Sequence, residues 1–310
     1  MSMGSADHAL APTAMTARQW LFEVAAPVWA ATRHPISGLL AERLTLDGAI
    51  DPVPRRLFVQ ARHIYSFVTL GRLGWQGPWQ EIAAGITDHL LAHAFRPDGL
   101  VLHRFDADGR PFDLRTDLYD QAFFLLAMAE AARGLGRADA LAAAHRLMDA
   151  LEAQWRHSAG GFQEGEINPT PRRQNPHMHL LEALLALDAT EPGARWAGLA
   201  QEIVTLCLTR FIDPASGALL EFFAPDLVPL DAAKGQQVEP GHCFEWAWLL
   251  ERASAIHPAA LAAADGLTAF ARAHGLDAGR GIAIDAVAAD GRVLDAGARL
   301  WPQTERLKIA

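Results

Sequence analysis

The sequence has few cysteines and no long apolar run, and these absences exclude several classes of protein. Only two cysteines, Cys207 and Cys243, occur in 310 residues, so a disulfide-stapled secreted fold is excluded and a reducing compartment fits. The longest apolar runs, such as residues 122–129, fall far short of the ~20 residues that a membrane-spanning helix needs. Residues 1–16 lack the basic start and the apolar stretch of a secretory signal. We therefore expect a soluble, cytoplasmic protein that has no membrane partner.

Positive charge is also scarce. The 27 lysines and arginines are outnumbered by 36 aspartates and glutamates, which gives a formal net charge of −9 and predicts that nucleic acid is not a partner. Apolar residues, by contrast, make up 51% of the chain, which excludes intrinsic disorder. A chain of this length buries about three quarters of its unfolded surface, so a large core is available.

One pattern recurs along the chain at intervals of about 60 residues. Each occurrence contains a glycine turn next to short strand-like runs, which is typical of β-hairpins. The four clear occurrences are 95–109, 157–165, 211–223 and 275–291, and a weaker fifth lies at 34–50. The intervals leave room for two helices in each repeat.

The intervening sequence carries the apolar period of amphipathic helices. The predicted helices are 18–32, 55–73, 79–94, 117–132, 138–155, 176–188, 195–210, 242–255, 259–274 and 302 onward. Paired helices at this interval predict an all-α toroid of the (α/α)6 type, with short β-hairpins between the helical pairs; an open solenoid is the alternative. We expect one barrel domain over residues 16–310 and a flexible segment over residues 1–15.

The predicted ring is incomplete at its C-terminal end, because it has five helical pairs and only the start of a sixth. The helices on either side of the gap would expose Leu21, Val24 and Leu307, and large apolar patches are uncommon on soluble monomers. We expect a second copy of the chain in a homo-oligomer, the N-terminal segment or additional polypeptide to cover this edge.

Polar side chains interrupt the apolar helices at the starts of the predicted inner helices. Residues three or four apart share one face of a helix. The clusters are Arg62 with Tyr65, Asn175 with His179, His242 with Glu245, residues 117–120 and residues 299–305. We expect all five to face one cavity that binds a sugar, because aromatic rings cover C–H groups while amides and charged groups bind hydroxyls.

Several of these residues have structural alternatives. Asn175 precedes a proline, so it could be only a helix cap. Arg62 could pair with Glu182 or Glu245, and either Tyr65 or Tyr119 could be a core residue. These alternatives stay open at the level of sequence.

The histidines point to acid–base chemistry rather than to a metal. His177 and His179 diverge on a helix, so no metal site is predicted. His242 is followed at i+3 by Glu245, a carboxylate that can orient it, and this arrangement is typical of a general base. With an ordinary pKa near ~6.5, a neutral histidine can remove a proton at physiological pH.

Together these segments resemble the N-acylglucosamine 2-epimerase family, which includes mannose isomerases and cellobiose 2-epimerases. The resemblance rests on R-H-x-Y-x-F at 62–67, D-L-Y-D-x-A-F at 117–123, R-x-Q-N-P-H-M-H-L-L-E-A at 172–183, E-P-G-H-x-F-E-W at 239–246 and R-L-W-P-Q-T-E at 299–305. It implies an (α/α)6 barrel and isomerisation or epimerisation of a sugar at C2 without a cofactor.

The resemblance also implies roles for individual residues. It assigns sugar binding to Arg62, Tyr119, Asn175, His179, Glu245 and Trp301, and one of two acid/base histidines to His242. In the family the second catalytic histidine lies beyond the W-P-Q-T-E segment, and it has no counterpart in this sequence. Because one base can shuttle a proton along one face of the sugar, isomerisation is favoured over epimerisation.

We therefore expect an aldose–ketose isomerase of the mannose–fructose type, which acts on a free monosaccharide through a cis-enediolate. Two alternatives remain within the family, namely N-acylglucosamine 2-epimerase activity and a catalytically impaired sugar-binding relative. A third is a glycoside hydrolase, which would use two carboxylates from among Asp120, Glu164, Glu166 and Glu245.

Overall fold

The computed structural model of the protein describes residues 12–309. Helix α1 (Pro12–Trp20) begins within the segment that the sequence predicts to be flexible, and the rest of that segment, residues 1–11, lies outside the described residues. The chain continues through the π-helical turn η1 (Leu21–Ala25) into α2 (Ala26–Ala30). These three elements together form the first predicted helix.

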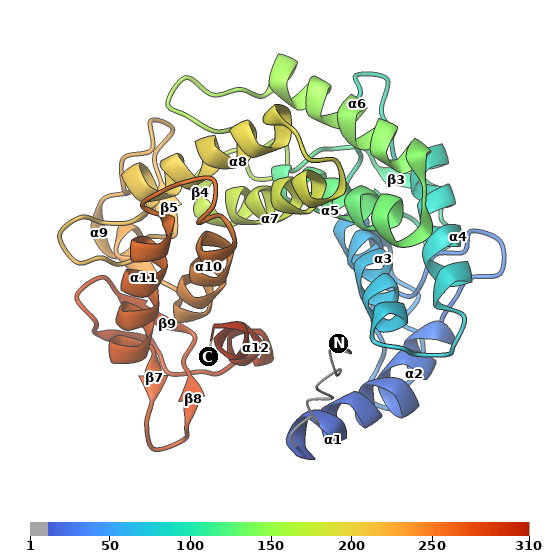
Figure 1. The fold of residues 1–310 in the computed structure, drawn as a ribbon, viewed down its shortest axis with the longest axis horizontal. Helices are drawn as coiled ribbons and strands as arrows, with labels where there is room; N and C mark the ends of the chain where they lie inside the picture. The colour runs from blue at the N-terminus through green and yellow to red at the C-terminus, as the bar shows by residue number, and fades with distance from the viewer. Residues whose placement is uncertain (1–11, 310) are drawn as a thin grey trace, which may run out of the picture.

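The remaining long helices form an inner and an outer layer of a ring (Figure 1). The inner helices are α3 (Leu57–Arg72), α5 (Leu118–Leu135), α7 (Gln174–Thr190), α10 (Pro240–Arg252) and α12 (Leu300–Lys308). The outer helices are α4 (Trp79–His93), α6 (Ala138–Gln154), α8 (Ala194–Leu206), which continues into the π-helical η2 (Cys207–Phe211), and α11 (Ala260–His274). Each outer helix packs against the inner helix that precedes it, and successive inner helices pack against one another. The predicted all-α, (α/α)-type toroid is confirmed.

The two layers differ in how they are buried. Helix α5 is buried almost all round, from Leu118 to Ala131, because its neighbours in both layers cover it. Helix α6 buries only one apolar stripe, which includes Leu147 and Leu151, and leaves its other face to solvent. Within residues 12–309, no helix combines the length and the apolarity needed to cross a bilayer.

The short strands differ from the predicted hairpins in an informative way. Local hairpins form where expected between β2 (Arg104–Phe105) and β3 (Pro111–Asp113), β7 (Leu276–Asp277) and β8 (Ile282–Ala283), and β9 (Ala286–Ala288) and β10 (Val293–Asp295). The hairpin expected at 211–223 is present as an isolated antiparallel bridge between Ile212 and Leu219, whereas β5 (Phe222–Phe223), at its end, pairs with β4 (Arg172–Arg173). The segment 157–165 forms only isolated bridges. One further helix, the four-residue α9 (Ala232–Gly235), was not expected.

Strands from neighbouring repeats hold the starts of the inner helices together. Strand β1 (Arg55–Arg56) pairs with β2 and leads directly into α3, and β4 leads directly into α7. Strand β6 (Gln237–Val238) pairs with β9 and ends just before α10. These two-residue ladders therefore set the positions at which three inner helices begin.

The described ring begins with α1 and α2 and ends with α12, and no described helix lies between these ends (Figure 1). Val24 is 48% exposed and Leu307 is 74% exposed, as predicted, whereas Leu21 is half-buried. A groove of about 550 Å³ follows this edge between α1–α2 and α3, with Trp20 and Trp29 in its lining. That another element covers this edge stays a prediction.

Candidate active site

The first two turns of the inner helices enclose a cavity of about 320 Å³, a size that suits a monosaccharide. All seven residues nominated from the sequence line this cavity, so their predicted convergence is confirmed. They are Arg62 from α3, Tyr119 from α5, Asn175 and His179 from α7, His242 and Glu245 from α10, and Trp301 from α12. Glu239, Arg299 and Glu305 also line it; they lie within the segments singled out from the sequence but were not nominated.

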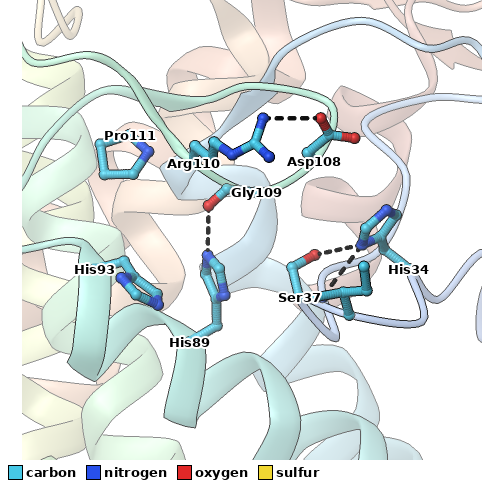
Figure 2. Close-up of a pocket in the computed structure, with 9 residues that line it drawn as sticks. His34, Ser37, His89, His93, Asp108, Gly109, Arg110 and Pro111 are labelled. Atoms are coloured by element: carbon cyan, nitrogen blue, oxygen red, sulfur yellow. Dashed lines mark hydrogen bonds and ion pairs between the residues drawn. The ribbon is translucent and has the colours of Figure 1, made fainter.

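A second, larger pocket of about 430 Å³ lies elsewhere, between the loop after α2, the end of α4 and the turn that joins β2 to β3 (Figure 2). Its polar groups bond mainly to one another. His34 Nδ1 accepts hydrogen bonds from the backbone N–H and the hydroxyl of Ser37, and His89 Nε2 donates to the carbonyl of Gly109 at 2.8 Å. Because the nominated residues all lie in the smaller cavity, we assign the candidate site to that cavity.

His242 is held by a carboxylate that sequence analysis missed. Its Nδ1 lies 3.0 Å from each carboxylate oxygen of Glu221, and both residues are buried. The expected orienting partner, Glu245, lies instead 3.9 Å from His179 Nδ1. That expectation is wrong because Glu245 lies one helical turn further along α10, whereas Glu221 comes from the segment that leads into β5. No local spacing signals a partner 21 residues away.

The surrounding carboxylates control the charge of His242. Burial alone would lower the pKa of its imidazole, but the charge of Glu221 and the hydrogen bond to it, aided by Glu239 and Glu245, raise that pKa to about 9. The neutral histidine with an ordinary pKa, expected from the sequence, is therefore wrong. At neutral pH the resting cavity holds an imidazolium.

Asn175 faces His242 and does not cap its helix. Helix α7 already begins at Gln174, directly after β4, so Asn175 lies within the first turn and the capping alternative is wrong. The side-chain nitrogen of Asn175 is 3.3 Å from His242 Nε2, and its Oδ1 has no hydrogen-bond partner. A charged His242 donates from Nε2, so we expect the amide to turn this unpaired oxygen towards the ring.

His179 forms a second carboxylate–histidine pair, one turn further along α7. Its Nδ1 is 3.2 Å from Glu182, and its ring lies edge-on to Tyr119 with centroids 4.9 Å apart. Burial lowers the pKa of His179 to about 4, although the hydrogen bond to Glu182 opposes this shift. His177 points elsewhere, towards Phe211, so the predicted divergence of the two histidines is confirmed.

Arg62 and Trp301 form aromatic contacts within the cavity lining. Arg62 donates to the Tyr119 hydroxyl at 2.7 Å, and its guanidinium lies 4.2 Å from the centre of the Phe123 ring. It contacts Tyr119 rather than forming the ion pair with Glu182 or Glu245 that the sequence left open. Trp301 packs on the His242 imidazole, with ring centroids 4.8 Å apart.

Two clusters have the residue types of a metal site. The ligand atoms of Glu221, Glu239 and His242 lie within 4.8 Å of one another, as do those of His179, Glu182 and Glu245. In the first cluster, however, Glu221 accepts hydrogen bonds from Gln174 Nε2 at 2.8 Å and from the backbone N–H of Glu239 at 3.2 Å. Carboxylate lone pairs that are occupied by N–H donors suit an imidazolium better than a divalent cation.

In the second cluster, a positive charge is already supplied by the protein. Lys308 Nζ lies 2.6 Å from Glu305, and its charge lowers the pKa of both Glu182 and Glu245. Burial, together with the charges of Glu305 and Glu182, nevertheless raises the pKa of Glu245 to about 8. This cluster therefore already has the positive charge of a lysine beside it.

The carboxylates considered for glycoside hydrolysis are not assembled. Of the four, only Glu245 lines the cavity. The other three form ion pairs elsewhere: Glu164 with Arg173, Asp120 with His103, and Glu166 with Arg96. These four residues therefore do not provide the pair of carboxylates that flanks a scissile glycosidic bond.

Known proteins are similar to this chain in both sequence and fold. The model of the N-acylglucosamine 2-epimerase family matches residues 39–310. The chain is 39% identical over 298 residues to a mannose-6-phosphate isomerase of Rhizobium meliloti (strain 1021), which covers 94% of this chain and 77% of that protein. It is 30% identical over 261 residues to a D-mannose isomerase of Thermobifida fusca, covering 74% of this chain and 60% of the relative.

Two solved structures have the same fold at lower identity. A sugar epimerase from a ruminal bacterium superposes with a TM-score of 0.85 at 18% identity and covers 94% of this chain and 79% of that chain. A D-mannose isomerase superposes with a TM-score of 0.84 at 22% identity and covers 98% of this chain and 81% of that chain. Because the family match spans every inner helix that contributes to the cavity, the chain belongs to the N-acylglucosamine 2-epimerase family of sugar isomerases and epimerases.

Proposed function

We propose that this protein interconverts an aldose and a ketose of the mannose–fructose type by moving a proton between C1 and C2 of an open-chain, unphosphorylated monosaccharide. One observation carries the proposal: His242 is anchored at Nδ1 by Glu221, so Nε2 is the nitrogen left to exchange a proton in the cavity. The relatives named as mannose isomerases support this substrate type.

The reaction is redox-neutral and needs one base on one face of the sugar. The C2–H bond breaks, the proton moves to His242 Nε2, and the electron pair forms the C1–C2 double bond of a cis-enediolate. Arg62, which lines the same cavity, supplies positive charge for the enediolate oxygens. Return of the proton to C1, with transfer of the hydroxyl proton from O2 to O1, gives the ketose.

The raised pKa of His242 determines which form of the enzyme begins this reaction. With a pKa of about 9, the neutral base is about 1% of the population at pH 7. The reaction therefore starts from a minor form, and we expect it to accelerate as the pH rises. Once His242 has taken the proton, its positive charge stabilises the enediolate beside it.

The charges of the cavity favour a neutral sugar over a sugar phosphate. Its two lining arginines are engaged, since Arg299 pairs with Glu239 at 2.7 Å and Arg62 donates to Tyr119. Among the described residues that line the cavity, His242 and Arg299 each have a carboxylate partner, which leaves Arg62 as the one cation without one, whereas three lining residues are glutamates. The substrate preference therefore differs from the one printed in the name of the Rhizobium relative.

The test is to incubate the purified chain with mannose, fructose, lyxose, N-acetylglucosamine or mannose 6-phosphate and to follow each sugar by NMR in deuterated buffer. We expect mannose and fructose to interconvert and mannose 6-phosphate to remain unchanged. Conversion of N-acetylglucosamine would instead favour the epimerase alternative. Binding of mannose without turnover would favour the sugar-binding alternative.

A further inference from the structure

We propose that Glu221, which does not line the cavity, is a positioning residue: it accepts the Nδ1 proton of His242 and thereby commits the opposite nitrogen, Nε2, to the substrate. This inference rests on the proposed function, because it concerns the same histidine. It adds a residue that none of the five polar clusters found in the sequence contains. The evidence comes from three layers of contacts around the carboxylate.

The first layer consists of the donors that reach the carboxylate. His242 Nδ1 lies 3.0 Å from both oxygens, Gln174 Nε2 donates to Oε2 at 2.8 Å, and the backbone N–H of Glu239 donates to Oε1 at 3.2 Å. Glu221 is only 3% exposed, so water does not compete for these bonds. A buried carboxylate with this many donors has one orientation, and it imposes one orientation on the ring.

The second layer fixes one of those donors. Gln174 is fully buried, and its Oε1 accepts a hydrogen bond from the indole N–H of Trp246. An amide whose oxygen is held in this way must direct its nitrogen to the other side, where Glu221 lies. Trp246 is on the same helix as His242, one turn further along, so α10 contacts the carboxylate both directly and through Gln174.

The third layer is the backbone of Glu221 itself. Its N–H donates to the carbonyl of Gln237, before α10, and its carbonyl accepts from the N–H of Gln174, at the start of α7. The next two residues form β5, which pairs with β4. Glu221 is thus clamped between the segments that begin the two helices carrying Asn175 and His242.

Several titratable and charged groups surround His242, and three of them, Glu221, Glu239 and Glu245, raise its pKa. The groups are Glu221 before β5, Glu239 and Glu245 at α10, His179 on α7, Arg299 directly before α12, and Glu305 on α12. Of these, Glu221 alone hydrogen-bonds to the ring through a carboxylate. Its removal should therefore change both the charge and the orientation of the imidazole.

The experiment compares Glu221→Gln with the native chain by NMR titration of the His242 ring, assigned with the His242→Gln variant. The glutamine keeps the size of the side chain and one acceptor oxygen but removes the charge. We expect the pKa of His242 to fall from about 9 to 6.5 or below, and the pH dependence of kcat/KM to move to lower pH by the same interval. Glu182→Gln, which removes the carboxylate of the other pair, is the matched control and should leave the His242 titration in place.

An unchanged His242 titration in folded Glu221→Gln would overturn the proposal, as would a native pKa already near 6.5. If Glu221→Gln does not fold, Glu221→Asp is the second variant, because it keeps the charge on a side chain that is shorter by one methylene. The proposal requires a lower His242 pKa in Glu221→Asp, and an unchanged pKa overturns it. The NMR measurement needs no turnover. A shifted titration in a chain that converts no sugar would therefore reject the proposed function and keep the role of Glu221.

Discussion

Two histidines line the same cavity, each with a glutamate at its Nδ1, and yet their pKa values move in opposite directions. The His242–Glu221 pair has a histidine pKa of about 9, whereas the His179–Glu182 pair has a histidine pKa of about 4. The distances from Nδ1 to the carboxylate are similar, 3.0 Å and 3.2 Å, and both rings are buried. Geometry within each pair therefore does not explain the difference.

The surroundings of each pair do explain it. Both rings are penalised by burial, but His242 has both oxygens of Glu221 beside it and the charges of Glu239 and Glu245 as well. His179 bonds through one oxygen of Glu182, and the positive charges of Arg62 and His242 oppose its protonation. Groups with pKa values pushed apart are typical of acid–base sites. The resting cavity thus contains a charged proton donor and a neutral proton acceptor.

Removing His242 should have the largest effect on activity. We expect His242→Gln to reduce kcat/KM for mannose by about 10²- to 10⁴-fold, the loss typical of deleting a general base. His93→Gln, on the exposed end of α4, is the control and should keep native activity. Steady-state kinetics of both variants provide the measurement. Native activity in His242→Gln would move the base elsewhere, with His179 the next residue to test.

The pH dependence of the native chain is the next largest effect. Because the neutral form of His242 is the base and its pKa is about 9, kcat/KM should rise about tenfold per pH unit well below 9, and about 50-fold in all between pH 7 and 9. A plot of kcat/KM against pH that levels off near pH 6.5 would show that His242 is not protonated in the resting enzyme at neutral pH. Initial rates in a series of overlapping buffers would measure this.

Stability should also depend on pH, with opposite signs for the two pairs. The folded-state pKa of His242 lies above its unfolded value of 6.5, so its contribution is present below pH 6.5 and is lost as the pH rises to about 9. The folded-state pKa of His179 is depressed, so stability should fall as the pH falls from 6.5 to about 4. Each slope is about 1.4 kcal/mol per pH unit. Urea unfolding at several pH values, repeated on His242→Gln and His179→Gln, should show each variant losing only its own slope.

The smallest expected effect concerns Glu182. Its hydrogen bond raises the pKa of His179 against the larger effect of burial, so Glu182→Gln should lower that pKa further. His179 is already neutral at physiological pH, and we therefore expect kcat/KM at pH 8 to change by less than about threefold. A loss as large as that of His242→Gln would mean that the charge on His179 matters to catalysis.

Local patterns in the sequence predicted the parts of this site that depend on local geometry. The apolar period predicted the helices, and the spacing of Asn175 and His179, or of His242 and Glu245, correctly placed each pair on the face that lines the cavity. The partner of His242 could not be found in this way. Glu221 is held beside it by backbone contacts with Gln237, before α10, and with Gln174, next to the β4–β5 ladder, and no periodicity within one helix reports such contacts.

The same contacts between distant segments explain why the sequence does not predict the charge of His242. A histidine with one i+3 carboxylate keeps a pKa set mainly by burial, as His179 shows. Gln174 carried no apparent function in the sequence, although it is fully buried and links Trp246 to Glu221. Buried amides of this kind become interpretable only when their partners are known.

The strands that join neighbouring repeats fix where the inner helices begin. The cavity is therefore sensitive to the insertion or deletion of a residue at the few positions where a strand meets an inner helix. Since α7 begins directly after β4, removing one residue at that junction would rotate the helix by about 100° relative to its ladder. Asn175 and His179 would leave the cavity together. The turn at Asp108–Gly109, by contrast, lies beyond its paired strands and can change length without rotating any inner helix. Insertions and deletions in such a turn are thus separated from those that would erase the site, so this fold can vary the turn while keeping its acid–base pairs in register.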